Sequence, residues 1–396
     1  MSEWKKVKLG EILQVKKGEY ITKKEAKEGI YPVILGGKEP AYYINKFNHT
    51  GKAIVISRSG ASAGYVSFWN EPIFVTDGFL IEPKDDVIFE FLYYILKSKQ
   101  RELHNTQKGA AIPHVTPALI GSIEGLLPDV FTQQNIVSIL FRYDSLIENY
   151  QKQIKLLEEA AQRLYKEWFV DLHFPGHENT KIVDGVPEGW EKKRLIDIAK
   201  LKAGGDKPEV FSKVKTSELK VPIFSNGTIE DGLYGYTEIA EINDQCVTIS
   251  ARGSVGYTVL RRKPFVPIVR LISVIPSNIY VGYLYFFIKG MPIESNGAAQ
   301  QQITVPMIKN KEVIIPPDII LDSFKEKEES YFRAIENYKE QILSLSEARD
   351  RLLPKLMSGE IAVEGRRPER PLSCHPNGNA LGMETETNNR PVGAKD

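Results

Sequence analysis

The chain has 396 residues, of which 42% are hydrophobic and 26% charged, so it is long enough for two or three domains and apolar enough to bury their cores. Its 52 basic and 51 acidic residues exclude a protein that coats nucleic acid through bulk positive charge, but not one with a local basic groove. Two cysteines, Cys246 and Cys374, are too few for a disulfide framework or a four-cysteine zinc site. The start of the chain has no apolar signal core, and the most apolar run, 280–288, is about half the length of a membrane helix, so we expect a soluble, cytoplasmic protein.

The chain contains an internal duplication. Gly109-Ala110-Ala111 recurs as Gly297-Ala298-Ala299, and at the same offset Ile147-Glu148-Asn149-Tyr150 recurs as Ile335-Glu336-Asn337-Tyr338. Upstream of these runs the match continues with small gaps. One module of about 180 residues therefore occurs twice, which indicates a domain duplication rather than a solenoid.

The first part of each module has the pattern of a mixed α/β domain. In the first copy, β-branched runs predict strands at 53–57 and 72–76, and a run rich in Leu, Tyr and Phe predicts a short helix at 87–97. The corresponding segments of the second copy are 245–250, 265–269 and 279–289. A strand is the alternative for the last segment of each copy.

Each module ends in a long predicted helix. The first helix is expected to start near Thr132 and to be stopped by Pro175-Gly176. The second is expected to start near Leu321, to be perturbed at Pro354 and to end at Gly359.

Apolar side chains recur along both long helices at alternating spacings of three and four residues, as in a heptad seam. The seam residues are Ile147, Tyr150, Ile154, Leu157 and Leu164 in the first helix, and Ile335, Tyr338, Ile342, Leu345 and Leu352 in the second. Such a stripe is buried by another helix with the same stripe, and the intervening domain favours antiparallel pairing. The alternative is that each helix is an amphipathic surface helix of its own domain.

These patterns predict an α+β chain in which two tandem α/β domains are separated by two long helices that pack as an antiparallel coiled coil. The expected boundaries are a first domain at 1–131, a helix at 132–172, a second domain at 173–317, a helix at 318–362 and a tail at 363–396. The tail is rich in Arg, Pro, Asn and Gly, which predicts disorder or an expression remnant.

No catalytic pattern stands out. The chain has no phosphate-binding P-loop, no Gly-x-Ser-x-Gly elbow and no His-Glu-x-x-His motif. His173 and His177 have the spacing of helical metal ligands, but Pro175-Gly176 lies between them, so we expect no metal and no cofactor. Two copies of a non-catalytic module joined by paired helices favour a bivalent reader. A protein–protein scaffold and an enzyme with an unrecognised site remain alternatives.

The sequence resembles the specificity subunit of type I restriction–modification systems. The resemblance covers about 1–362 and is carried by the Gly-Ser turns and by short runs at equivalent places in the two copies. These runs are Trp4-Lys5-Lys6-Val7-Lys8-Leu9-Gly10-Glu11, Pro187-Glu188-Gly189-Trp190-Glu191-Lys192-Lys193-Arg194-Leu195, Leu127-Pro128, Ile315-Pro316-Pro317 and the closing Arg351-Leu352-Leu353-Pro354-Lys355-Leu356-Met357-Ser358-Gly359-Glu360-Ile361.

The resemblance implies that each globular module is a target recognition domain that reads one half of a split sequence in double-stranded DNA. It also implies that the paired helices fix the gap between the half-sites and dock methyltransferase subunits, two of them, with restriction subunits joining the assembled complex. The specificity subunit is non-catalytic in this family. A seam of about 22 residues spans roughly 33 Å, close to one turn of B-DNA, which suits a spacer.

Basic and amide side chains on turns are the candidates for DNA contact, because Lys and Arg bind phosphates and guanine edges and Asn and Gln bind adenine. In the first module these are Lys16, Lys17, Lys23, Lys24, Arg58, Ser59, Ser62 and His114. In the second they are Lys202, Asn226, Arg252, Ser254, Arg261, Arg262, Gln300, Gln301 and Gln302. The alternative is that the arginines stabilise turns and the lysines are merely solvated.

Overall fold

The structure, a computed structural model, describes residues 4–22, 26–37, 39–105, 114–292 and 302–363. The tail predicted to be disordered lies outside the described residues from 364 onwards. The chain divides into two compact units. Unit 1 comprises Met1–Arg142 and Ala348–Asp396, and unit 2 comprises Tyr143–Glu347, so each long helix begins in one unit and ends in the other.

The globular part of unit 1 contains short strands and helices in an alternating order. They are β1 (Lys5–Lys8), α1 (Leu9–Ile12), β2 (Leu13–Lys17), β3 (Glu28–Ile34), β4 (Tyr42–Ile44), β5 (Ala53–Ser57), β6 (Val66–Trp69), β7 (Phe74–Val75), β8 (Gly78–Pro83), α2 (Phe89–Ser98), α3 (Gln100–Asn105), α4 (Pro117–Ser122) and β9 (Glu124–Leu127). The long helix α5 (Val130–Tyr165) follows and continues into a π-helical turn, η1 (Lys166–Val170).

The globular part of unit 2 repeats this order after a short 3₁₀ turn, η2 (His177–Asn179), and a hairpin. Its elements are β10 (Ile182–Val183), β11 (Val186–Pro187), β12 (Glu191–Arg194), α6 (Leu195–Ile198), β13 (Ala199–Ala203), β14 (Val221–Phe224), η3 (Ile229–Gly232), β15 (Leu233–Thr237), β16 (Cys246–Ile249), β17 (Thr258–Arg261), β18 (Val266–Pro267), β19 (Ile272–Pro276), α7 (Val281–Gly290), α8 (Val305–Ile308) and β20 (Glu312–Ile315). The second long helix is α9 (Asp318–Met357).

The two globular parts have the same sheet topology, which confirms the duplication. Each has an antiparallel four-stranded sheet, in the order β2-β8-β5-β6 in one unit and β13-β19-β16-β17 in the other. Each has a three-stranded sheet with one parallel pair, β4-β3-β7 and β15-β14-β18, and a two-stranded sheet, β1-β9 and β12-β20. The registers match as well, since Lys17 pairs with Phe79 and Ala203 pairs with Ile272 at equivalent ends of the large sheets.

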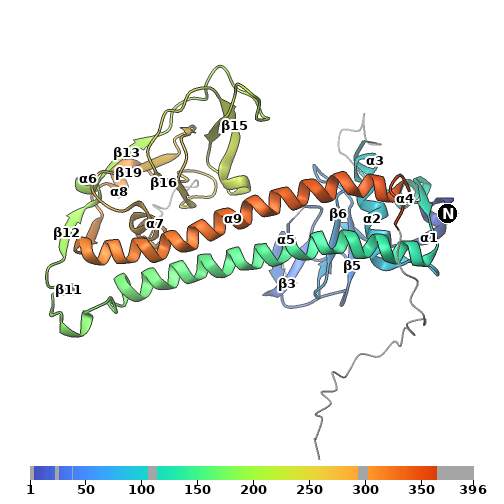
Figure 1. Ribbon diagram of the computed structural model, residues 1–396, viewed down its shortest axis with the longest axis horizontal. Coiled ribbons are helices and arrows are strands. Elements are labelled where there is room, and N and C mark those ends of the chain that lie inside the picture. Colours follow the sequence, from blue (N-terminus) through green and yellow to red (C-terminus); the bar gives the residue numbers. More distant parts are fainter. Residues whose placement is uncertain (1–3, 23–25, 38, 106–113, 293–301, 364–396) are drawn as a thin grey trace, which may run out of the picture. The chain divides into compact units, whose positions relative to one another are not determined.

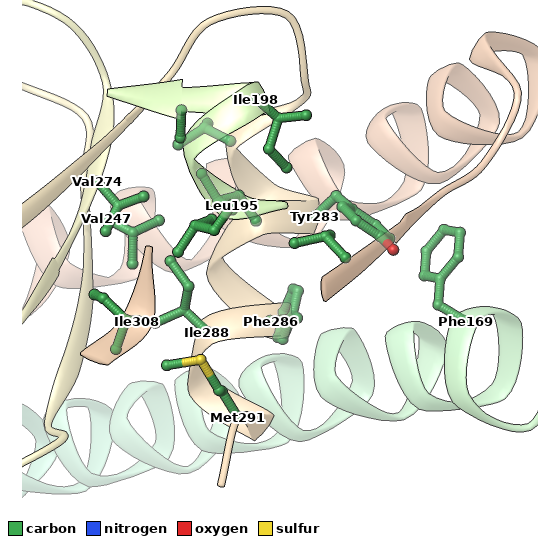
Figure 2. Close-up of a cluster of buried hydrophobic side chains, with 14 of the residues drawn as sticks. Phe169, Leu195, Ile198, Val247, Val274, Tyr283, Phe286, Ile288, Met291 and Ile308 are labelled. Atoms are coloured by element: carbon green, nitrogen blue, oxygen red, sulfur yellow. The ribbon is translucent and has the colours of Figure 1, made fainter. Parts of the chain in front are cut away.

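The central strands of the large sheets form the cores with a covering helix. Every residue of β5 and of β16 is buried, as expected for β-branched runs covered on both faces. The predicted short helices are present as α2 and α7. Figure 2 shows the unit 2 core, where Tyr283, Phe286 and Ile288 of α7 meet side chains from α6, β16 and β19.

The long helices pair in an antiparallel arrangement, as the seam predicts. In unit 2 the rings of Tyr150 and Tyr338 stack with centroids 5.0 Å apart, and in unit 1 the end of α9 shares a core with the start of α5 (Figure 1). Ile147 and Ile335 are buried, and none of the ten predicted seam residues is exposed. The pairing rather than a single-helix surface is therefore the correct interpretation of the heptads.

The ends of the helices differ in detail from the expected ones. The Asp129 carboxylate accepts a hydrogen bond from the Thr132 backbone N–H at 3.0 Å, so the first helix is capped by Asp129 and starts at Val130. Pro354 lies within the last turn of α9, which continues to Met357. The π-helical turn after α5 contributes Trp168 and Phe169, both buried, to an aromatic cluster with Phe324.

Among the described residues, no helix is both long and apolar enough to cross a membrane.

Candidate nucleic-acid interface

In unit 1, candidate residues gather where β2 and β5 end and β8 begins. Arg58 directly follows β5, and its Nε lies 2.6 Å from a carboxylate oxygen of Asp77, the residue before β8. The Arg58 backbone is fixed as well, because its N–H donates to the Asp77 carbonyl at 3.2 Å and its carbonyl accepts from Val115 at 2.8 Å. The guanidinium is therefore held at the sheet edge while its side chain keeps 42% exposure.

Ser59 and His114 extend this edge. They form an antiparallel bridge with each other, and the Ser59 hydroxyl donates to the Asp77 carboxylate. His114 is exposed. Ser62 lies in the following turn, where its carbonyl accepts from Tyr65 at 2.9 Å. Hydroxyl, imidazole and guanidinium groups therefore lie close together on one loop cluster, which is a set suited to hydrogen bonding with bases and phosphates.

The equivalent edge of unit 2 carries Arg252 and Gln302. Both side chains are exposed, and Arg252 Nε donates to the Gln302 amide oxygen at 3.3 Å. Ser254, in the same turn, is also exposed. Asn226 has a different role, because its amide oxygen accepts from Ala251 and its amide nitrogen donates to the Val269 carbonyl, each at 2.7 Å. Asn226 therefore ties three loops together.

The candidate lysines lie on exposed strand positions. Lys16 forms an ion pair with Glu82 at 2.7 Å and Lys202 forms one with Glu241 at 2.5 Å, while Lys17, at the end of β2, is exposed. Surface ion pairs of this kind contribute little to stability and exchange readily for phosphate contacts.

Two predicted contact residues instead stabilise the fold of unit 2. Arg261 is only 6% exposed, donates to the Thr248 hydroxyl at 3.1 Å and stacks on Phe224 at 3.6 Å. Burial lowers the pKa of its guanidinium to about 10. Arg262 approaches the buried carboxylate of Glu328 at 3.4 Å and stacks on the Phe332 ring. Neither side chain is available at the loop edge, so the interface proposed below omits both.

Four candidates, Lys23, Lys24, Gln300 and Gln301, lie outside the described residues. No cluster of three or more His, Cys, Asp and Glu side chains that could hold a metal occurs in the described part of the chain. The rings of His173 and His177 lie 5.3 Å apart, and His177 Nδ1 lies 2.9 Å from the Phe174 carbonyl.

The sequence-based selection omitted two residues at these edges, Asp77 in unit 1 and Arg270 in unit 2. Asp77 is acidic and therefore lies outside the basic and amide pattern of predicted contacts, although it orients Arg58. Arg270 is exposed and lies between β18 and β19. Both directly precede equivalent residues, because the carbonyls of Gly78 and Leu271 accept the same hydrogen bond from the residue that follows β2 or β13.

Similarity to known proteins covers most of the chain. The family model for the type I restriction modification DNA specificity domain matches 1–159 and 187–329. The type I restriction enzyme MjaIX specificity subunit of Methanocaldococcus jannaschii is 32% identical over 339 residues, covering 79% of this chain and 78% of that protein. A putative type I specificity subunit of Mycoplasma pneumoniae, S.MpnORF507P, is 27% identical over 78% of this chain and 84% of its own. The crystal structure of the type I restriction–modification S subunit from M. genitalium shares the fold, with a TM-score of 0.55 at 21% identity over 90% of this chain and 96% of that one.

Proposed function

Because this chain belongs to the family of type I restriction–modification DNA specificity subunits, we propose that each of its two globular modules reads one half of a bipartite DNA sequence. The observation that carries the proposal is the duplication: one topology occurs twice, each time with polar loops at the same edge of the large sheet. The chain itself is the non-catalytic, DNA-recognising component of its system.

The interface that we propose consists of the loop edges. In the first module it includes Arg58, Ser59 and His114, with Lys17 beside them, and in the second it includes Arg252 and Gln302. Lys16, Lys202, Ser62 and Ser254 are secondary candidates for phosphate contact, because they lie on neighbouring strands and turns. Hydrogen-bonding groups of both donor and acceptor type at each edge support base reading, and the exposed basic groups support phosphate contact.

We further propose that the paired helices set the spacer between the half-sites and dock two methyltransferase subunits, with restriction subunits joining that complex. Heptad packing makes a stiff connection, whereas a flexible linker would blur the spacing. Apolar side chains that do not face the partner helix support the docking role: Leu146 and Leu156 on α5 are 42% and 58% exposed, and Leu343 on α9 is 65% exposed. We expect the complex to act in the cytoplasm, where the chromosome is.

A domain exchange tests the reading proposal. Residues 1–131 are replaced by the first module of a relative, and the methylated motifs of cells that express the exchanged chain with its methyltransferase are sequenced. We expect one half-site to change while the other half-site and the spacer stay the same. A motif changed in both halves, or unchanged, contradicts modular reading.

Charge introduced on the helices tests the docking proposal. Leu156→Asp together with Leu343→Asp is expected to abolish co-purification of methyltransferase subunits, because a carboxylate cannot be buried unpaired in an apolar contact. Gln162→Asp, which adds one such carboxylate at an exposed polar position of α5, is the control. Equal co-purification of both variants excludes this face as the docking surface.

A further inference from the structure

The strand registers allow the two modules to be compared position by position at the loop edge. In unit 1 the Gly18 N–H donates to the Gly78 carbonyl at 3.0 Å, and in unit 2 the Gly204 N–H donates to the Leu271 carbonyl at 2.9 Å. The residues immediately before Gly78 and Leu271 are Asp77 and Arg270. Both residues therefore directly precede the same position of the large sheet, although the connection that carries them is one residue longer in unit 2.

Several backbone hydrogen bonds around this place recur in both modules. Ser57 and Ser250 donate from their N–H groups to Tyr65 and Tyr257, at 3.0 and 2.9 Å, and their carbonyls accept from a glycine at 2.9 Å in each case. The carbonyl of the residue after each serine accepts a backbone hydrogen bond, from Val115 before α4 at 2.8 Å in unit 1 and from Ile303 before α8 at 3.0 Å in unit 2. These backbone hydrogen bonds are thus shared by the copies while the side chains around them are free to differ.

Four corresponding positions around these hydrogen bonds carry different side chains in the two modules. The pairs, with the unit 1 residue first, are Arg58 and Ala251, Ser59 and Arg252, Asp77 and Arg270, and His114 and Gln302. In unit 1 the arginine is neutralised by the neighbouring carboxylate. At the corresponding positions of unit 2 the arginines are Arg252 and Arg270, and neither forms an ion pair with another described residue. Equivalent strands that carry different side chains at their ends are what two readers of different half-sites require.

Arg270 is presented by a strained and tightly held turn. Val269 and Arg270 have φ angles of 53° and 62°, a left-handed conformation that is costly for side chains other than Gly, and most costly for a β-branched one. Three backbone-directed hydrogen bonds hold this turn: Val269 N–H to Gly205 at 2.8 Å, Arg270 N–H to Gly204 at 2.9 Å, and the Asn226 amide to the Val269 carbonyl at 2.7 Å. The backbone that carries Arg270 is thereby fixed.

We infer that Arg270 is a specificity-determining residue of the second module, which reads a guanine of its half-site, with Asn226 as the positioning residue that holds its turn. The inference rests on the proposed function and deepens it. A guanidinium donates two parallel hydrogen bonds to the O6 and N7 atoms of guanine. It distinguishes guanine from other nucleobases well only when the backbone that carries it is held in place. The exposed Arg270 side chain on a clamped turn meets both conditions.

Two substitutions of Arg270 test the inference in the full chain assembled with methyltransferase subunits. Arg270→Gly removes the side chain and suits the left-handed backbone, so it leaves the fold intact. Arg270→Lys keeps the charge and loses the bidentate geometry. The control is Lys200→Ala, an exposed position of β13 at the end of the strand away from Gly204 and the Arg270 turn. Each variant is used to select DNA from a random pool and to methylate DNA in cells.

We expect both Arg270 variants to lose discrimination at one G·C position of one half-site by roughly fivefold to 150-fold, with the other half-site unchanged. Lys200→Ala is expected to select the motif of the natural chain. An unchanged motif in both Arg270 variants overturns the inference. This includes the case in which only the salt dependence of DNA binding changes, with the slope of log K for DNA binding against log salt falling by about 0.9, as expected for loss of a phosphate contact. If the natural assembly selects no motif at all, the proposed function itself fails, and that outcome is distinguishable from the previous one.

Discussion

Phe324 holds the first turns of α9 in the unit 2 core, and its removal has a calculable cost. The side chain is fully buried, and its ring lies 4.9 Å from the ring of Phe169 in an edge-to-face arrangement. The rings of Trp168 and Phe286 lie within 6.3 Å. Phe324→Ala is therefore expected to lose apolar burial, to leave a cavity and to lose aromatic pairs, at a cost of about 3–5 kcal/mol in the free energy of unfolding.

The assay is thermal and urea unfolding of the full chain. For a unit of this size, 1 kcal/mol shifts the melting temperature by about 2–4 °C, so Phe324→Ala is expected to lower the unit 2 transition by roughly 6–20 °C. The control is Ile319→Ala, because Ile319 lies in the same helix and is 77% exposed, so its substitution is expected to change stability by about 0.5 kcal/mol or less. Equal shifts in the two variants would refute the assignment of Phe324 to the core.

Two further predictions concern the same unit. Burial raises the pKa of the Glu328 carboxyl above its ordinary value of 4.5, despite its bonds to Tyr280 and Arg262, so the folded chain binds this proton more tightly than the unfolded chain. The free energy of unfolding should then fall as pH rises from 4.5 through the raised pKa. Urea midpoints measured against pH should decline less in Glu328→Gln than in the natural chain. Parallel curves for the two proteins would contradict this. Ile342→Asp places a charge in the helix seam and is expected to lower the urea midpoint, and Leu343→Asp on the exposed side is the matched control.

Much of the fold was predictable because its signals are local or periodic. The β-branched run at 53–57 coincides with β5, and the heptad spacing identified the helix pair. The predicted strands at 72–76 and 265–269 reduce to two-residue strands, because each pairs in parallel with its neighbour over only two positions. The π-helical turn after α5 was not predictable, because it depends on the core that receives Trp168.

The contact residues stay a prediction, although the structure places several of them together at strand ends. Arg58 and Arg252 follow strand ends, which sequence patterns identify well. Arg261 shows the limit: it lies at the end of β17, where its charge suggested exposure, but it stacks on Phe224 and is buried. Asp77 and Arg270 became visible as equivalent positions only through hydrogen-bond register, because identity between the copies is lost there.

The core of unit 1 determines which segment must be transferred in a clean exchange of the first module. Leu353 and Leu356, from the end of α9, are buried in the same cluster as Ile136 of α5. An exchange of 1–131 alone makes these α9 side chains pack against a module from another protein, to which they are not matched. We therefore expect this chimaera to have a lower urea midpoint than one in which 348–362 is also transferred. The altered half-site should be the same in both chimaeras, because stability and reading depend on different residues. Equal midpoints would show that the end of α9 does not complete this core, and different motifs would show that it takes part in reading.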